Sequence, residues 1–120
     1  LYDSLQHIAR TNFLRLKSNQ NIWDIFTHDI NQRIRKNSQV YKCKKRYETL
    51  LTKLIVMAQK NKELIAGVNP RTILNMFFGP IEYIAIKYRM YGEDFDIDET
   101  VNDIVNTIFR AYSKKKDFIK

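Results

Sequence analysis

The sequence contains few of the residues that make tight turns or covalent cross-links. Only three Gly and two Pro occur in 120 residues, too few for the many turns of a β-sandwich or barrel. Strand-like alternation of apolar and polar residues does not persist over any long stretch. The single cysteine, Cys43, excludes an internal disulfide and suits a reducing compartment. These absences predict an all-α protein of the cytoplasm.

Patterns typical of catalysis or metal binding are also missing. His7 and His28 are the only histidines, and they share no metal-ligand spacing with each other or with Cys43. The sequence shows no paired acids, no Ser/His/Asp arrangement and no glycine-rich phosphate loop. We therefore predict that the protein is not an enzyme, and we expect neither a bound metal nor a cofactor.

Helical periodicity is what the sequence does contain. Apolar residues recur at three- and four-residue steps in about five segments, which cover residues 1–17, 22–34, 38–60, 70–91 and 97–113. Short polar breaks separate these segments, and no repeat or linker is visible. A chain of this length can bury a core of its own. The prediction is a single all-α domain over residues 1–120, with about five helices in a bundle.

The ends of the last two helices carry clear signals. Asn69 is a good N-cap, and Pro70 follows at the first helical position, where its missing N–H costs nothing. Gly92 is placed to end that helix in a left-handed conformation. Asp96 and Glu99 have the spacing of a capping box at the start of the last helix. These residues predict helix boundaries at 70, 91 and 97.

The segment 70–91 is apolar on nearly all sides. Such a helix is buried nearly all round, and the other helices of so short a chain can hardly cover it. Asn75, Gly79, Pro80 and Glu82 interrupt the segment too early for a membrane span. We therefore expect a homodimer, in which a second copy covers this helix together with the last one. The predicted interface residues are Gly79, Tyr83, Ile86, Val105, Phe109 and Tyr112.

Large rings are spread over several of the predicted helices. They can form plain core, or they can line an apolar cavity for a small molecule. In the second interpretation, Glu82 is a polar anchor within the cavity; in the first, it reaches a polar edge of the helix or pairs with a basic neighbour. The residues expected around such a cavity are Phe13, Trp23, Phe26, Tyr47, Leu51, Leu54, Phe78 and Glu82.

Positive charge is concentrated in one part of the chain. The net charge is +8, and residues 32–62 contain ten Lys or Arg against the single acid Glu48. Such a basic band is either a solvated helix face, an attractor for an anionic effector such as an acyl-CoA, or a surface for nucleic acid. A helical nucleic-acid-binding module is therefore an alternative function, and its affinity would fall steeply with salt.

The order of these parts resembles the C-terminal half of a TetR-type transcriptional regulator. The resemblance is carried by GVNPRTILNMFFGPIEYIAIKYRMYGEDFDIDETVNDIVNTIFRAYSK, with its long apolar helix, glycine-acidic loop and final helix. The upstream stretches HIARTNFLRLKSN and NQNIWDIFTHDINQRI are similar to the two helices that line the ligand cavity in that family. The resemblance covers essentially the whole chain.

The resemblance implies an effector-binding and dimerisation domain. In the family, the last two helices pair with those of a second protomer. A small, mostly apolar effector binds among the earlier helices and thereby controls DNA binding by an N-terminal helix-turn-helix domain. No helix-turn-helix precedes Leu1 in this sequence, so we expect a fragment whose DNA-binding domain is missing. DNA is then a partner only through that missing domain, and no membrane partner is expected.

Overall fold

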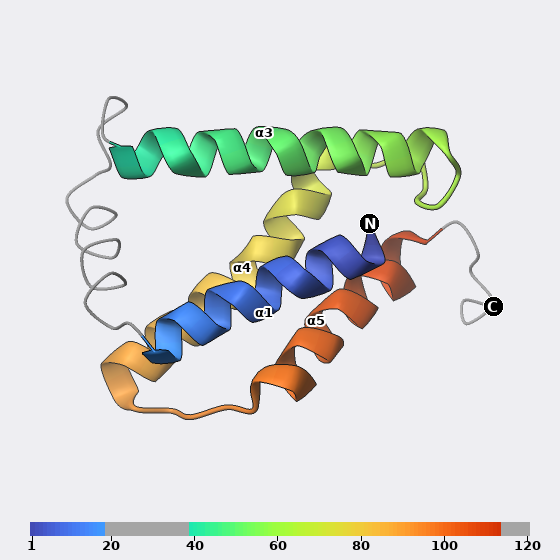
Figure 1. The fold of residues 1–120 in the computed structure, drawn as a ribbon. Coiled ribbons are helices and arrows are strands. Elements are labelled where there is room, and N and C mark those ends of the chain that lie inside the picture. Colours follow the sequence, from blue (N-terminus) through green and yellow to red (C-terminus); the bar gives the residue numbers. More distant parts are fainter. Residues whose placement is uncertain (19–38, 114–120) are drawn as a thin grey trace.

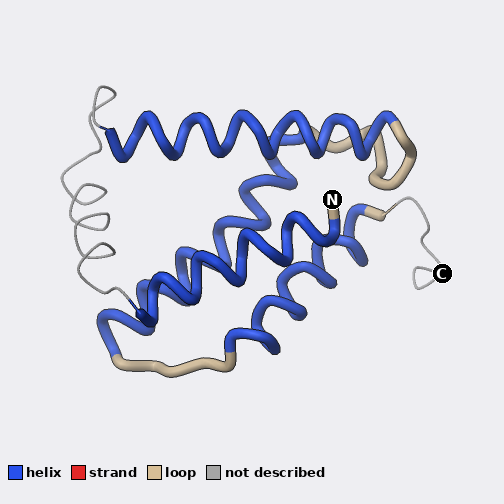
Figure 2. The backbone as a smooth tube through the Cα atoms, in the orientation of Figure 1, coloured by secondary structure: helices blue, strands red, loops and turns tan. Residues whose placement is uncertain are grey.

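In a computed structural model, residues 1–18 and 39–113 are described. They form the helices α1 (Tyr2–Ser18), α3 (Gln39–Lys60), α4 (Pro70–Tyr91) and α5 (Ile97–Tyr112), joined by loops (Figures 1 and 2). The predicted all-α class is confirmed, with four helices in the described part. The predicted helix over 22–34 lies outside the described residues. Across the described ranges, no helix has the length and apolarity that a bilayer crossing requires.

The helix ends follow the capping signals of the sequence. The Asn69 side chain accepts a hydrogen bond of 2.9 Å from the Arg71 N–H at the start of α4. At the other end, Gly92 takes the left-handed conformation (φ 67°), and its N–H bonds back to α4. Asp96 accepts a hydrogen bond of 2.9 Å from the Glu99 N–H and so caps α5. The three predicted boundaries of these helices are therefore confirmed.

The helices α1, α4 and α5 pack together, and α3 lies across the first half of α4 (Figure 1). The most extensive pairing is between α1 and α5, while α3 packs chiefly against α4. One apolar core joins all four helices. Its largest fully buried side chains are Phe13, Phe77, Leu5, Leu16, Leu51, Ile55, Leu64, Ile73, Val101 and Val105.

A row of polar side-chain contacts runs along the α1–α5 pair. In each contact, a residue of α1 donates a hydrogen bond to a residue of α5. The contacts are Tyr2 Oη to Asn106 Oδ1 at 2.6 Å, Gln6 Nε2 to Asn102 Oδ1 at 2.9 Å, and Arg10 Nε to Asp98 Oδ1 at 3.0 Å. We refer to these three contacts as the α1–α5 ladder.

The connector from α3 to α4, residues 61–69, is tied to the end of α5. Leu64 is buried in the core, and the Ile65 N–H donates to the Tyr112 carbonyl at 2.8 Å. The Gln59 side-chain amide donates to the Ile65 and Val68 carbonyls at 3.0 and 2.8 Å. The last turn of α3 and the last turn of α5 are therefore held together.

Candidate ligand-binding and interface surfaces

The residues predicted to line a ligand cavity have different positions in the structure. Phe13 and Leu51 are fully buried in the core. Leu54 and Phe78 are half-buried and pack against that core, with the Phe78 ring edge-on to Phe77 at 5.0 Å. The described residues therefore bring these four side chains into or against the core, where each is already in contact with the rest of the chain.

The remaining predicted cavity residues do not join them. Tyr47 is 45% exposed on α3, and Glu82 is half-buried on α4. Trp23 and Phe26 lie outside the described residues. Whether these residues line a ligand site stays a prediction.

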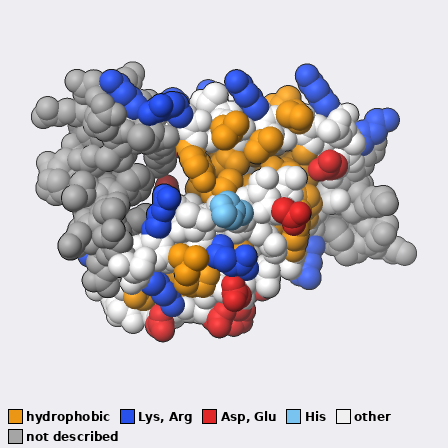
Figure 3. All heavy atoms as spheres, viewed as in Figure 1, with side chains coloured by type: hydrophobic (Ala, Val, Ile, Leu, Met, Phe, Trp, Pro, Cys, Tyr) orange, Lys and Arg blue, Asp and Glu red, His pale blue; other side chains and the backbone are white. Residues whose placement is uncertain are grey.

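An exposed apolar strip runs along α3. Tyr47, Leu50, Leu54 and Met57 follow one another at three- and four-residue steps, so they share one side of the helix. Leu50 is 58% and Met57 is 55% exposed, although both are large apolar side chains. We call these four residues the α3 surface. In Figure 3, hydrophobic side chains gather over the middle of α3 and between α3 and α1, and Lys and Arg side chains follow the outer edge of α3.

A second exposed apolar strip lies on α4. It consists of Met76, Gly79, Tyr83, Ile86 and Met90, which alternate steps of three and four residues. This 3.5-residue period is the spacing that lets one helix pair along a seam with another. Tyr83 is 64% and Met90 is 70% exposed. A Cβ added at Gly79 would meet no atom within 4 Å, so a second helix has room to approach there. We call these five residues the α4 surface.

The predicted interface residues on α5 are packed into or against the core of their own chain. Val105 is fully buried within the chain. Phe109 packs edge-on against the Tyr2 ring at 5.2 Å, and Tyr112 also packs against the core. Tyr83, Ile86 and Gly79 are therefore the predicted interface residues that the structure leaves at the surface.

The cavity and interface residues predicted from the sequence did not include Leu50, Met57, Met76 or Met90. Their common signal is present in the sequence as heptad-like spacing. That spacing alone does not distinguish an exposed strip from a buried one, because buried core residues of a helix recur with the same period.

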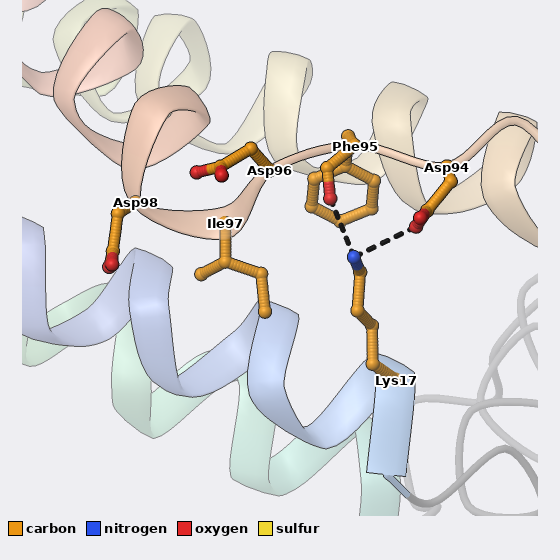
Figure 4. Close-up of a pocket in the computed structure, with 6 residues that line it drawn as sticks. All are labelled: Lys17, Asp94, Phe95, Asp96, Ile97 and Asp98. Atoms are coloured by element: carbon orange, nitrogen blue, oxygen red, sulfur yellow. Dashed lines mark hydrogen bonds and ion pairs between the residues drawn. The ribbon is translucent and has the colours of Figure 1, made fainter.

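An open depression of about 530 Å³ lies where the end of α1 meets the loop between α4 and α5 (Figure 4). Lys17 points into this loop, and its Nζ donates to Asp94 Oδ1 at 2.8 Å and to the Phe95 carbonyl. The same Nζ lies 4.5 Å from the centre of the Phe95 ring. Phe95 in turn packs edge-on against Phe13 at 4.8 Å and Tyr88 at 5.7 Å. Lys17 and Phe95 therefore attach α1 to this loop.

These contacts perturb two ionisable groups. The hydrogen bond from Lys17 lowers the pKa of the Asp94 carboxyl, with further help from the Phe95 backbone and from the Lys17 charge. The hydrogen bond to Glu93, 3.0 Å away, raises the pKa of Lys87. Asp94 is exposed and Lys87 is partly exposed, and their ion pairs with Lys17 and Glu93 attach α1 and α4 to the loop.

Replacing Asp94 with asparagine is expected to lower stability slightly at neutral pH. The folded-state pKa of Asp94 lies below its unfolded value of about 3.9. Its contribution is therefore complete above that pH and is lost as the pH falls through the folded pKa. Urea unfolding should show a larger difference from wild type at pH 7 than near pH 2.5. Asp103→Asn, an exposed change on α5, serves as the control; equal effects of both variants at pH 7 would contradict the role of Lys17.

The described basic side chains of the 32–62 band are exposed. Lys45, Lys53 and Arg71 surround a second depression of about 440 Å³ between α3 and α4. Glu48 lies in the same depression and offsets part of the charge. Within residues 1–18 and 39–113, no group of three His, Cys, Asp or Glu side chains is arranged to hold a metal ion.

Comparison with known proteins gives one family. The model for the family described as YsiA-like protein, C-terminal region, one of the TetR C-terminal regions, matches residues 2–111. Neither the curated proteins nor the solved structures gave a significant match.

Proposed function

Because the chain belongs to the YsiA-like family of TetR C-terminal regions, we propose that it is the ligand-sensing and dimerisation part of a cytoplasmic transcriptional repressor. The family is regulatory and non-enzymatic. In this proposal, a small apolar effector binds this region and controls DNA binding by a helix-turn-helix domain elsewhere in the repressor. The family match is the observation that carries the proposal, and the two exposed apolar surfaces support it.

The α3 surface is the proposed effector site. Leu50 and Met57 are each more than half exposed on α3, and Tyr47 on the same side is 45% exposed. Full burial of an exposed Leu or Met side chain contributes about 1.5–3 kcal/mol, so covering the exposed half of either one contributes about 1 kcal/mol. An apolar molecule lying along α3 would cover Tyr47, Leu50 and Met57 at once, which favours an apolar effector over a polar one.

The α4 surface is the proposed dimer interface. Large apolar side chains exposed in one continuous strip are typical of surfaces that bind another protein. The strip is regular over about 21 Å, from residue 76 to residue 90 at 1.5 Å per residue. A closed dimer uses the same patch on both protomers, and a seam of this period can meet its own copy.

Binding of an apolar effector is expected to raise the melting midpoint of the protein. At a ligand concentration of 100 times Kd, selective binding to the folded state adds about 2.7 kcal/mol. This corresponds to a shift of roughly 10 °C for a domain of this size. A panel of fatty acyl, aromatic and cationic lipophilic compounds should be screened by thermal shift and by the fluorescence of Trp23, the only tryptophan.

For any compound that raises the melting midpoint or changes the fluorescence, a matched pair of variants locates the binding site. Leu50→Ser should reduce the thermal shift, because it removes apolar surface from α3. Met90→Ser, a similar change on α4, should leave the shift intact. A panel in which no compound changes either signal would contradict the effector proposal, and loss of the shift in Met90→Ser alone would move the site to α4.

The nucleic-acid alternative is separated from this proposal by its salt dependence. A protein that neutralises several phosphates loses affinity steeply as salt rises. We expect this chain to show at most weak association with duplex DNA at low salt. A gel shift that survives physiological salt and discriminates between sequences would favour the alternative.

A further inference from the structure

The depression between α3 and α4 gathers positive charge from both helices. Lys45 and Lys53 reach it from α3, and Arg71 reaches it from the first turn of α4. Among the described residues that line it, Glu48 is the only acid, so three positive charges against one negative leave a formal charge of +2. Like charges that share one site repel each other, and an anion placed between them would remove this repulsion.

Packing beneath the depression sets the positions of these charged side chains. Leu74 of α4 is only 5% exposed and forms part of the lining. On the other helix, Leu51 and Ile55 are buried in the same core, and α3 packs chiefly against α4. The core therefore fixes where the cationic side chains begin, while their long, flexible stems allow the charged ends to close on a ligand.

The depression and the α3 surface lie on different sides of α3. Successive residues of an α-helix are turned by about 100°. Positions 45, 49 and 52, which line the depression, are therefore about opposite to positions 47, 50 and 54 of the α3 surface. A small molecule bound on the α3 surface would leave the depression open, so a ligand of the depression is a second ligand, beyond the proposed effector.

We propose that this depression binds the phosphate group of a small anion, which bridges α3 and α4. The formal charge of +2 matches that of a phosphate monoester, about −1.5 to −2 at pH 7, better than that of a single carboxylate. The Arg71 guanidinium can donate two parallel hydrogen bonds to phosphate oxygens, and the lysine ammonium groups add charge-assisted ones. The volume of about 440 Å³ lies within the range of small-molecule sites.

Titration of the protein with sodium pyrophosphate tests this proposal. The NMR signals of backbone amides should be followed at low, constant ionic strength. Signals of 45–53 and 71–75 should shift together and reach saturation, because both helices contribute to one site. Sodium chloride at the same ionic strength should not reproduce these shifts. Shifts that do not saturate, or that chloride reproduces, would overturn the site.

Three single-residue variants give the charges of the depression opposite signs of effect. Arg71→Gln should weaken pyrophosphate binding by about tenfold, because it removes the bidentate donor. Glu48→Gln should strengthen binding several-fold, because it removes the negative charge from the lining. Lys60→Gln is the matched control, since it removes the same charge as Arg71→Gln from an exposed position of α3 outside the lining. Equal losses in Arg71→Gln and Lys60→Gln would overturn the site, and so would weaker binding in Glu48→Gln.

Duplex DNA carries the same phosphate chemistry and is the second arm of the experiment. If the ligand is a small anion, a short duplex should not displace pyrophosphate at physiological salt. A duplex that displaces it and binds less tightly to Arg71→Gln would overturn the assignment to a small anion and favour the nucleic-acid alternative. Because the α3 surface lies on another side of α3, a failure of pyrophosphate to bind leaves the effector proposal to its own thermal-shift test.

Discussion

Tyr83→Glu is expected to convert a dimer into a monomer that remains folded. Tyr83 lies at the centre of the α4 surface, and it is 64% exposed within the chain, so the protomer loses little by the change. In the proposed dimer, the glutamate would bring an unpaired charge into an apolar seam. Loss of a central aromatic at an interface typically costs about 2 to 4 kcal/mol, which corresponds to roughly 30- to 1000-fold in Kd. Sedimentation at micromolar concentrations, with circular dichroism for the fold, measures both effects.

The control for this variant is Leu50→Glu. Leu50 is about as exposed as Tyr83, but it lies on α3. This variant should remain dimeric. A dimer that survives Tyr83→Glu and dissociates in Leu50→Glu would place the interface on the α3 surface and reverse the two proposed roles.

Gly79→Leu tests whether a helix of the second protomer approaches the α4 surface closely at Gly79. A Cβ added at Gly79 meets no side chain or other segment within 4 Å beyond the adjoining part of α4, so the isolated protomer leaves open space there. Association should weaken more than folding does. Unchanged dimerisation would remove Gly79 from the contact.

Phe13→Ala is expected to cause the largest loss of stability among the residues first predicted to line a cavity. Phe13 is fully buried and packs edge-on against Phe95. Truncation of a buried phenylalanine costs about 3 to 5 kcal/mol, because transfer free energy is lost and a cavity remains. The melting midpoint should fall by roughly 10 to 20 °C at constant protein concentration.

The neighbouring Leu14 provides the control. Leu14 is 52% exposed, so Leu14→Ala should cost less than about 1 kcal/mol. The comparison of the two variants also tests whether Phe13 is part of the packed core or lines a ligand cavity. If Phe13 lined an open cavity, its truncation would enlarge that cavity at small cost, and the two variants would have similar melting midpoints.

The sequence alone determined the four helices that the structure describes, and it determined the ends of α4 and α5. The cap at Asn69, the left-handed Gly92 and the cap at Asp96 depend on hydrogen bonds between residues a few positions apart. Such local interactions are visible in a single segment, because their partners are fixed by the spacing along the chain. The order of these elements was also enough to identify the resemblance to the TetR family, which the family match over residues 2–111 confirmed.

Only the tertiary structure decided which apolar residues are covered. Periodicity predicted stripes on α4 and α5, but it could not distinguish the buried Val105 from the exposed Tyr83. The α1–α5 ladder could not be predicted from the sequence either, since its partners are separated by 88 to 104 residues. Burial depends on which neighbour packs against a given side of a helix. That choice is made by contacts between distant segments, whose pairing no local pattern specifies.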